Sequence, residues 1–184
     1  MNPASRKPST EEINAAKNKT IPDVLAARLE VLFVGINPSL YSAAVGHHFA
    51  RPGNRFWPAL AKSGLTPRLF TPFEEQRLVE HGIGLTNFVA RATARADELS
   101  NTEIRAGVRK LQGKVRRRKV RCVAFLGITA YRTGFKRPQA QVGAQAETLG
   151  ESTLWVLPNP SGLNAHYQLP DFARLFKQLL TRSP

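Results

Sequence analysis

The stretch Val31-Leu-Phe-Val-Gly-Ile-Asn37-Pro38-Ser39 decides the fold, and its pattern recurs in Leu154-Trp-Val-Leu-Pro-Asn159-Pro160-Ser161. In both stretches, a short apolar run bounded by Gly or Pro predicts a buried strand. The Asn-Pro pair that follows predicts a turn, because the residue before a proline avoids the helical region. If the two strands are neighbours in a parallel sheet, both turns lie at the edge where open α/β sheets bind ligands. The repeated turn is therefore the first candidate for a functional site.

Strand and helix patterns alternate along the rest of the chain. Residues 83–88 and 120–126 predict two further strands, and Ser100-Asn-Thr-Glu103 has the capping-box spacing that opens an amphipathic helix. Residues 21–29 predict a short helix, and residues 134–151 show no regular pattern. This alternation indicates an α/β fold with three α/β/α layers and a central, mostly parallel, four-stranded sheet.

The length of 184 residues suits one domain with a hydrophobic core. Residues 1–19 are rich in Asn, Ser, Lys and Pro, so we expect a flexible basic tail followed by a single domain over residues 20–184. The chain has neither an apolar run of the roughly 20 residues that span a membrane nor a secretory signal. The single cysteine, Cys122, excludes a disulfide framework and any metal site built from several thiolates. We expect an intracellular protein.

The charge of the chain indicates the kind of partner. Lys and Arg total 27 against 13 acidic residues, which gives a net charge of +14. A domain this basic is a candidate for nucleic-acid binding, because neutralising phosphates releases counterions. A basic proteome or a membrane-surface role is the alternative. No Asp or Glu occurs between Val31 and Phe73, a window that contains the first Asn-Pro turn. This distribution favours a surface that faces a polyanion.

Three motifs follow one another in the chain: Gly35-Ile-Asn-Pro-Ser-Leu40, Gly46-His-His-Phe-Ala-Arg-Pro-Gly-Asn-Arg-Phe-Trp57 and Asn159-Pro-Ser-Gly-Leu163. Together they resemble those of the mismatch-specific uracil/thymine DNA glycosylases of the uracil-DNA glycosylase superfamily, over residues 21–180. The resemblance implies hydrolysis of the N-glycosidic bond of a damaged or mispaired base that has been flipped out of the duplex. It implies neither a metal nor a cofactor.

The resemblance assigns Asn37 to positioning the attacking water, although a turn-forming asparagine would show the same pattern. It places Ile36, Ser42, His48 and Phe49 in the base pocket. Phe49 would stack on the flipped base, an interaction worth roughly 1–3 kcal/mol, unless it is a core residue under its loop. His48 would lie at the edge of the pyrimidine or in solvent, and Ser42 would face the C5 position.

The second Asn-Pro turn matches the family's loop that enters the duplex. Leu163 corresponds to the wedge residue, which inserts between base steps. Gly162 would let the backbone approach DNA closely, Ser161 would hold a phosphate, and Asn159 would brace the loop. An exposed leucine in a loop rich in Gly and Asn has no core explanation, which favours the wedge.

Two residues depart from the family pattern. Ser39 replaces a glycine, and Ala165 replaces an arginine that helps to read the opposite base. We therefore expect a wider substrate range, which includes single-stranded DNA. Asp97 is a second catalytic candidate, because its loop leaves the same edge of the sheet and a carboxylate can stabilise a sugar cation or activate water. The alternative for Asp97 is an ordinary acidic residue before the helix start at Ser100.

One segment is more basic than the rest of the chain: nine of the 17 residues from Arg105 to Arg121 are Lys or Arg. A DNA-binding patch and a solvated helix end explain this segment equally well. If it contacts phosphates, each lost contact should flatten the salt dependence of binding by about one unit.

The sequence therefore predicts a monomeric glycosylase that acts on double-stranded DNA with U·G or T·G mismatches. We expect it to be monofunctional, because no lysine lies in the first motif to attack the sugar as an amine. The alternative is a non-catalytic nucleic-acid-binding protein that uses the same basic surface. A nucleotide hydrolase is disfavoured, because the chain lacks a Gly-rich phosphate loop that ends in Lys-Ser or Lys-Thr.

Overall fold

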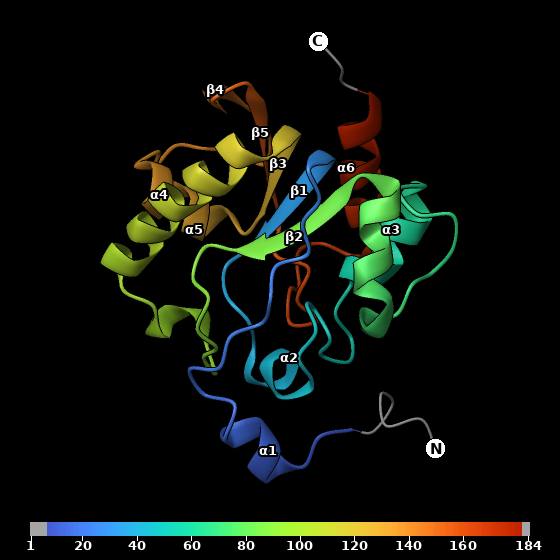
Figure 1. Cartoon of the computed structure of the whole chain (residues 1–184), viewed down its shortest axis with the longest axis vertical. Coiled ribbons are helices and arrows are strands. Elements are labelled where there is room, and N and C mark those ends of the chain that lie inside the picture. The colour runs from blue at the N-terminus through green and yellow to red at the C-terminus, as the bar shows by residue number, and fades with distance from the viewer. Residues whose placement is uncertain (1–6, 182–184) are drawn as a thin grey trace.

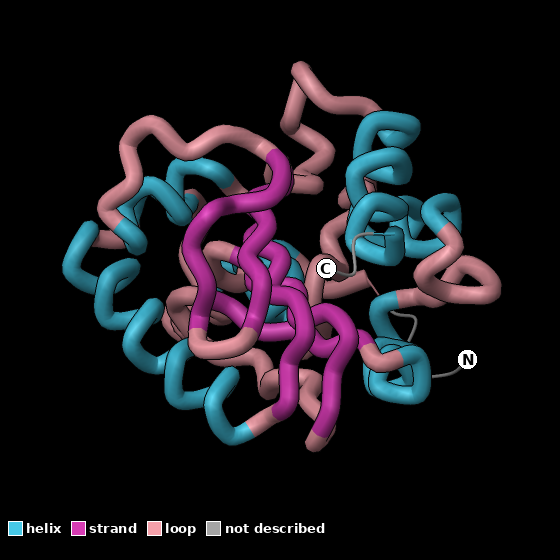
Figure 2. The backbone as a smooth tube through the Cα atoms, turned by 90° about the horizontal axis from the view of Figure 1, so that it is seen from above, coloured by secondary structure: helices cyan, strands magenta, loops and turns pink. Residues whose placement is uncertain are grey.

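The structure is a computed structural model that describes residues 7–181. One five-stranded sheet, in the order β2-β1-β3-β5-β4, lies between two groups of helices (Figures 1 and 2). The strands are β1 (Arg28–Gly35), β2 (Ile83–Asn87), β3 (Lys119–Leu126), β4 (Gly143–Leu149) and β5 (Ser152–Leu157). The α-helices are α1 (Thr10–Asn14), α2 (Leu40–Val45), α3 (Phe56–Ser63), α4 (Asn101–Arg117), α5 (Ile128–Phe135) and α6 (Leu169–Thr181). Two 3-10 helices are η2 (Pro72–His81) and η3 (Ala96–Glu98).

The central strands are buried on both faces because helices cover the sheet from both sides. Strands β2, β1, β3 and β5 run parallel, and successive side chains of β1 point to opposite faces. Val31 and Phe33 pack in the core that α3 and α6 cover, whereas Leu32 and Val34 pack in the core that α4 and α5 cover. The predicted three-layer α/β fold with a mostly parallel sheet is confirmed.

The number of strands differs from the prediction of four. The fifth strand, β4, lies in the segment that shows no pattern in the sequence, and it pairs antiparallel with β5. Its residues alternate between half-buried and exposed positions and include few large apolar side chains. An edge strand covered on one face needs no continuous apolar run, so the segment carries little of the signal that marks the central strands.

The helix predicted over residues 21–29 is not formed. Val24 exchanges backbone hydrogen bonds with Leu85 of β2, with N···O distances of 2.9 and 2.8 Å, and β1 begins at Arg28. The backbone N–H and carbonyl oxygen of Val24 therefore bond to the free edge of β2, and not to neighbours within a helix.

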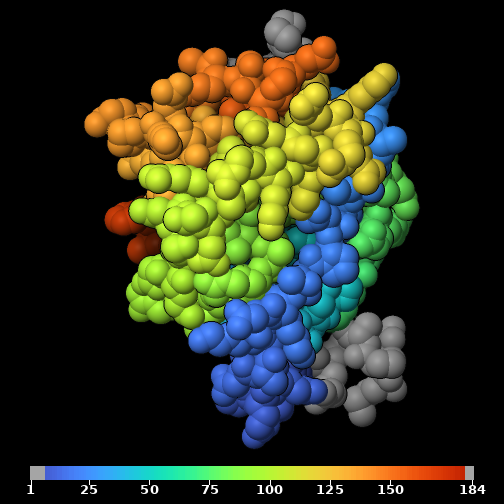
Figure 3. Space-filling model, turned by 60° about the vertical axis from the view of Figure 1, so that its left-hand side comes forward, coloured from blue at the N-terminus to red at the C-terminus, as the bar shows by residue number. Residues whose placement is uncertain are grey.

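Residues 7–19 of the expected flexible tail contain regular structure. Ser9 and Glu12 form a capping box at the start of α1, and Ala16 is fully buried against Ala43 and Ala92. Figure 3 shows this N-terminal segment, in blue, against the green surface formed by residues that follow β2. Residues 1–6 lie outside the described residues, and the division of the chain at residue 19 stays a prediction. Within residues 7–181, no helix is long and apolar enough to cross a membrane.

Both Asn-Pro turns lie at the carboxyl edge of the sheet, as the sequence indicates. Strand β1 ends at Gly35 and β5 ends at Leu157, and each runs directly into its turn. The two strands are not neighbours, because β3 lies between them in the sheet. In Figure 1, α2 and the loops that follow β1 lie below the sheet at this edge. The candidate site is therefore wide enough to span three parallel strands.

Candidate active site

The amide of Asn37 has a fixed orientation. Its Nδ2 donates to the carbonyl oxygen of Arg91 at 3.0 Å and to Thr93 Oγ1 at 2.7 Å. The Thr93 hydroxyl in turn donates to the carbonyl oxygen of Arg95 at 2.7 Å, which makes it an acceptor for Asn37. Because both protons of the amide face this loop, Oδ1 points away from it, and no described residue donates a hydrogen bond to Oδ1. The half-buried side chain thus presents an acceptor at the sheet edge.

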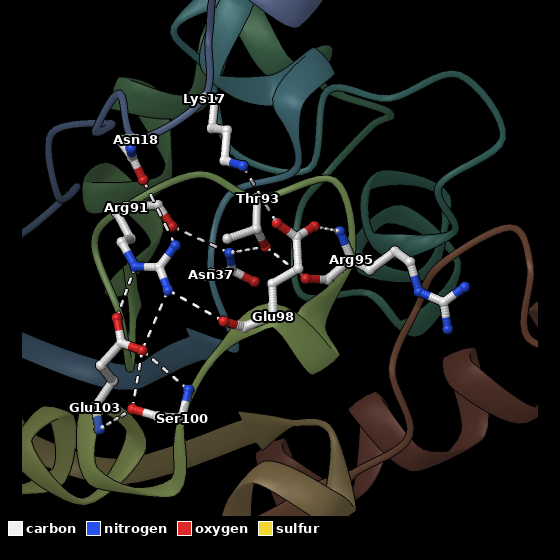
Figure 4. A network of polar contacts seen from close by, with 9 residues as sticks. All are labelled: Lys17, Asn18, Asn37, Arg91, Thr93, Arg95, Glu98, Ser100 and Glu103. Atoms are coloured by element: carbon white, nitrogen blue, oxygen red, sulfur yellow. Dashed lines mark hydrogen bonds and ion pairs between the residues drawn. The ribbon is translucent and has the colours of Figure 1, made fainter.

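The loop that holds Asn37 is itself tied to helix α4 (Figure 4). The Arg91 guanidinium donates to both carboxylate oxygens of Glu103, from Nε at 2.6 Å and from Nη2 at 3.1 Å. Glu103 also closes the capping box of α4 with Ser100. Its partners Arg91 and Ser100 lower the pKa of the Glu103 carboxyl to about 2. A charged network at the start of α4 therefore supports the backbone that orients Asn37.

Phe49 adopts an unusual backbone conformation that places its ring beside β1. Its φ of +53° lies in the left-handed region, which bulky residues rarely adopt. The ring packs on Phe56, with centroids 4.3 Å apart and an interplanar angle of 31°. A Cβ at Gly35 would lie only 3.3 Å from Phe49 Cζ, so the glycine makes room for the ring. Phe49 is half-buried and packs against the edge of the core that α3 and α6 cover.

A buried carboxylate holds the loop that carries Phe49. Glu75 of η2, 3% exposed, accepts from the His48 backbone N–H at 2.8 Å and contacts His47 Nδ1 at 2.9 Å. Trp57 Nε1 donates to the His48 carbonyl oxygen at 3.2 Å. These contacts fix the loop on both sides of His48 and stabilise the left-handed turn at Phe49.

His48 is buried in the loop that carries Phe49. The solvent-exposed alternative is wrong, because only 2% of the residue is exposed. Its Nε2 lies 3.0 Å from the Pro22 carbonyl oxygen, and burial lowers its pKa, so Nε2 carries the proton of a neutral ring. A ring engaged with the backbone in this way packs the loop, and a contact with a base stays a prediction.

The hydroxyls of Ser39 and Ser42 are both used within the protein. Ser39 caps α2, where its Oγ accepts from the Ser42 backbone N–H, and it also donates to Ser42 Oγ at 3.1 Å. Ser42 Oγ then accepts from the Ala50 backbone N–H at 3.1 Å. Ser42 is 3% exposed and therefore anchors the residue that follows Phe49. Its predicted role opposite the C5 position of a pyrimidine stays a prediction.

Asn87 is a candidate site residue that the sequence analysis did not select. It ends β2 directly beside Gly35 in the parallel register, and a Cβ at Gly35 would lie 2.4 Å from Asn87 Oδ1. Among residues 7–181, no side-chain hydrogen bond of Asn87 is formed. An unengaged amide beside the Phe49 ring can recognise the edge of a planar base by donating and accepting. A polar residue at the end of an apolar strand was the available signal.

The second turn exposes the predicted wedge. Leu163 is 79% exposed, and its backbone N–H donates to Ser161 Oγ at 3.3 Å. Asn159 Oδ1 accepts from the Ser161 backbone N–H at 3.1 Å, and the Asn159 carbonyl oxygen accepts from Asn164 Nδ2 at 3.0 Å. Close packing requires a glycine at position 162, because a Cβ there would lie 2.8 Å from the Gly53 carbonyl oxygen. Hydrogen bonds within the loop thus hold its shape, and the Leu163 side chain is exposed.

A cavity of about 550 Å³ opens at the ends of β3 and β5. Ile36 and Asn159 line it, together with Gly127 at the start of α5. The Ile36 side chain lies beside Gly127, where a Cβ would be 2.9 Å from Ile36 Cδ1. The cavity joins the two turns but does not include Asn37 or Phe49 in its lining.

Asp97 lies on η3 at the surface, with 62% of its side chain exposed. Arg95 holds its carboxylate in a fork, with Nη2 2.6 Å from Oδ2 and Nε 3.1 Å from Oδ1. This pairing with Arg95 lowers the pKa of Asp97, which keeps it ionised but makes it a weak base. Arg95 is connected to Asn37 indirectly, because its carbonyl oxygen accepts from the Thr93 hydroxyl, which in turn accepts from Asn37. The catalytic role of Asp97 stays a prediction.

The candidate site thus consists of two Asn-Pro turns at the carboxyl edge of an α/β sheet, one beside an aromatic ring and one bearing an exposed leucine. The sequence model of the Uracil DNA glycosylase superfamily matches residues 22–181, and the chain belongs to this superfamily. It is accordingly a DNA glycosylase, a hydrolase of DNA repair that acts on uracil. The fold is similar to a solution NMR structure from Methanosarcina acetivorans, of a protein proposed to be a uracil DNA glycosylase. The two share 20% identity and a TM-score of 0.62, over 89% of this chain and 98% of that one.

Proposed function

We propose that the chain is a monofunctional glycosylase that removes uracil, and also thymine or other altered pyrimidines, from mismatched DNA by base flipping. The observation that carries this proposal is the orientation of Asn37, whose amide nitrogen is bonded twice while its oxygen has no partner among the described residues. An oxygen in that state accepts a hydrogen bond from water and aims the water at the sugar carbon.

The chemistry follows from the neutrality of the amide. An amide orients water but is a poor general base, so the glycosidic bond breaks largely before water adds to the cationic sugar. The ring of Phe49 gives the flipped base a surface to stack on, and the amide of Asn87 lies beside it for the pyrimidine edge. The exposed Leu163 fills the space that the base leaves in the duplex.

The monofunctional character follows from the side chains available. No lysine occurs between Gly35 and Trp57, so this segment offers no amine to form a Schiff base with the sugar. The product is then an intact abasic site, on which strand cleavage requires added alkali. A strand break without alkali would contradict this part of the proposal.

The test is release of base from a labelled U·G duplex, with T·G, U·A and single-stranded uracil in parallel. Asn37→Ala should lose most activity, whereas Asn101→Ala, an exposed asparagine at the start of α4, should retain it. Because Ala165 leaves no arginine to read the opposite base, U·A and single-stranded DNA should also be substrates. Binding without any abasic product would support the non-catalytic alternative, and activity confined to U·G would contradict the wide substrate range.

A further inference from the structure

One arginine connects the second Asn-Pro turn to the start of α3. Arg55 directly precedes α3, in the motif that carries Phe49, but its guanidinium reaches the wedge loop, residues 159–164. Nη1 donates to the carbonyl oxygens of Ser161 at 2.9 Å and Asn164 at 3.0 Å. Nη2 is 3.5 Å from the Gly162 carbonyl oxygen and 3.4 Å from Gln168 Oε1. The backbone acceptors of the wedge loop therefore converge on a single cation from the start of α3.

The backbones of the two segments also touch. The Arg55 backbone N–H donates to the Pro160 carbonyl oxygen at 2.8 Å. Gly162 packs so closely on Gly53 that a Cβ would lie 2.8 Å from the Gly53 carbonyl oxygen. Gly53 has a φ of +82°, in the left-handed region that favours glycine, and the missing Cβ of Gly162 is what lets the two backbones approach. The contact is close enough to fix the distance between the segments.

The residue type suits this role. Arginine carries five N–H donors in a rigid planar fork, whereas the ammonium of lysine is a single point. Here the fork reaches several backbone carbonyls of one turn, and no carboxylate within residues 7–181 forms an ion pair with it. Because these carbonyls face Arg55, Leu163 between them is left on the outer side, where it is 79% exposed.

We propose that Arg55 is a positioning residue that holds the wedge loop in the form that enters the duplex. The inference rests on the proposed function, because it needs Leu163 to act as the wedge. A side chain that separates stacked bases works against a few kcal/mol of stacking, so its loop must resist being pushed back. Arg55 supplies that resistance by fixing the loop to the start of α3. It acts through Leu163 and does not touch the reacting atoms.

The consequence is a dependence on the strandedness of the substrate. Uracil in a single strand has no duplex to open and needs no wedge, so Arg55 matters for duplex substrates alone. Arg55→Gln, which removes the fork, should lower kcat/KM on a U·G duplex by about 10- to 100-fold relative to single-stranded uracil. Arg55→Lys, which keeps the charge but not the fork, should give a smaller loss in the same direction.

Arg51→Gln is the matched control, because Arg51 is an exposed arginine of the same loop and its loss removes the same charge. It should lower both activities by a similar factor. Leu163→Ala should reproduce the duplex-specific loss of Arg55→Gln. The double variant Arg55→Gln/Leu163→Ala should lose no more duplex activity than the more severe single variant, since both changes impair the same wedge loop.

Hydrogen exchange gives a readout that does not depend on activity. The amides of residues 159–168 should exchange faster in Arg55→Gln than in wild type, while the core amides of β1 and β3 stay protected. Equal losses on duplex and single strand, additive effects with Leu163→Ala, or unchanged exchange would each overturn the proposal. If the wild type releases no base from any substrate, the proposed function fails first; if it does and Arg55→Gln behaves like Arg51→Gln, the role of Arg55 fails alone.

Discussion

At the scale of single residues, the site depends on hydrogen bonds that orient an amide. Thr93 is 2% exposed, and its hydroxyl is one of the two acceptors of Asn37 Nδ2. Thr93→Val keeps the shape but removes this acceptor, so Asn37 can rotate and present nitrogen where the proposed mechanism requires an acceptor for water. We expect kcat to fall by about 10-fold on duplex and single-stranded substrates alike, with little change in KM. Thr93→Ser, which keeps the hydroxyl, is the control and should stay near wild type in steady-state assays.

A second prediction concerns the space at Gly35. A Cβ there would lie 2.4 Å from Asn87 Oδ1 and 3.3 Å from Phe49 Cζ, so Gly35→Ala must displace both side chains. We expect a loss of activity of at least about 10-fold, seen mainly in KM, because base binding is disturbed before the chemical step. Gly113→Ala is the matched control: the nearest atoms there belong to the flexible Arg117 side chain, at 3.4 Å. Full activity of Gly35→Ala would remove Asn87 and Phe49 from the base pocket.

At the scale of elements, the start of α4 carries an ionic network with a defined pH dependence. The pKa of Glu103 is lowered to about 2, from an ordinary value of 4.5, mainly by its bonds with Arg91. A lowered pKa means that this stability is fully present above pH 4.5 and is lost as the pH falls toward 2. Glu103→Gln should therefore lower the melting temperature at pH 7 and flatten its decline between pH 5 and 3.

The control for this prediction is Glu80→Gln, on η2. Glu80 makes one long contact, 3.9 Å from Arg77 Nε, and 60% of its side chain is exposed. Its replacement should leave the thermal profile close to that of the wild type. An acid-induced decline of the same slope in Glu103→Gln and wild type would contradict the role of the network.

Elements with a complete local signal could be predicted from the sequence, and elements without one could not. The Ser100–Glu103 capping box marks the start of α4, and the apolar run after Glu30 marks β1, because both signals are local and strong. The edge strand β4 was missed, because one covered face leaves half of its positions polar. The helix predicted around Val24 is wrong, because Val24 pairs with Leu85, whose distance in the sequence leaves no local signal.

At the scale of the whole molecule, the end of the basic segment around Arg116–Lys119, where α4 ends and β3 begins, lies away from the site. Lys119 begins β3 and pairs in register with Arg28 at the start of β1, so Arg116–Lys119 lie at the amino edge of the sheet. Asn37 and Asn159 follow the carboxyl edge. Neutralising Arg116, Arg117 and Lys119 should therefore leave the salt dependence of binding to a short mismatched duplex unchanged.

The matched change at the site edge is Arg51→Gln. If Arg51 contacts one phosphate, its loss should reduce the slope of log K against log salt by about 0.9. Filter binding or fluorescence anisotropy at several salt concentrations measures both slopes. A flatter slope for the variant with three neutralised residues would show that DNA reaches the amino edge, and it would favour the DNA-binding interpretation of that segment.

The candidate site could be predicted only in part, because motifs identify residues but not their partners. Asn37, Phe49 and Leu163 stand in recognisable sequence patterns. The proposed roles of Asn87 and Arg55 depend on which strands are neighbours and which loops are in contact. Spacing along the chain shows neither of these arrangements. The burial of His48 likewise depends on Pro22, a residue outside every motif.

The docking of the N-terminal segment has a practical consequence for shortened versions of the protein. Asn18 N–H donates to the Ala92 carbonyl oxygen at 2.9 Å, and Ala92 N–H donates to that of Lys19 at 2.8 Å. Ala92 adjoins Arg91, whose carbonyl oxygen orients Asn37. Trimming the chain to residues 20–184 would therefore loosen the backbone that orients Asn37. With Asn37 in its proposed role, the trimmed enzyme should turn over more slowly than the full chain in a side-by-side excision assay. Affinity tags are better attached at the opposite terminus.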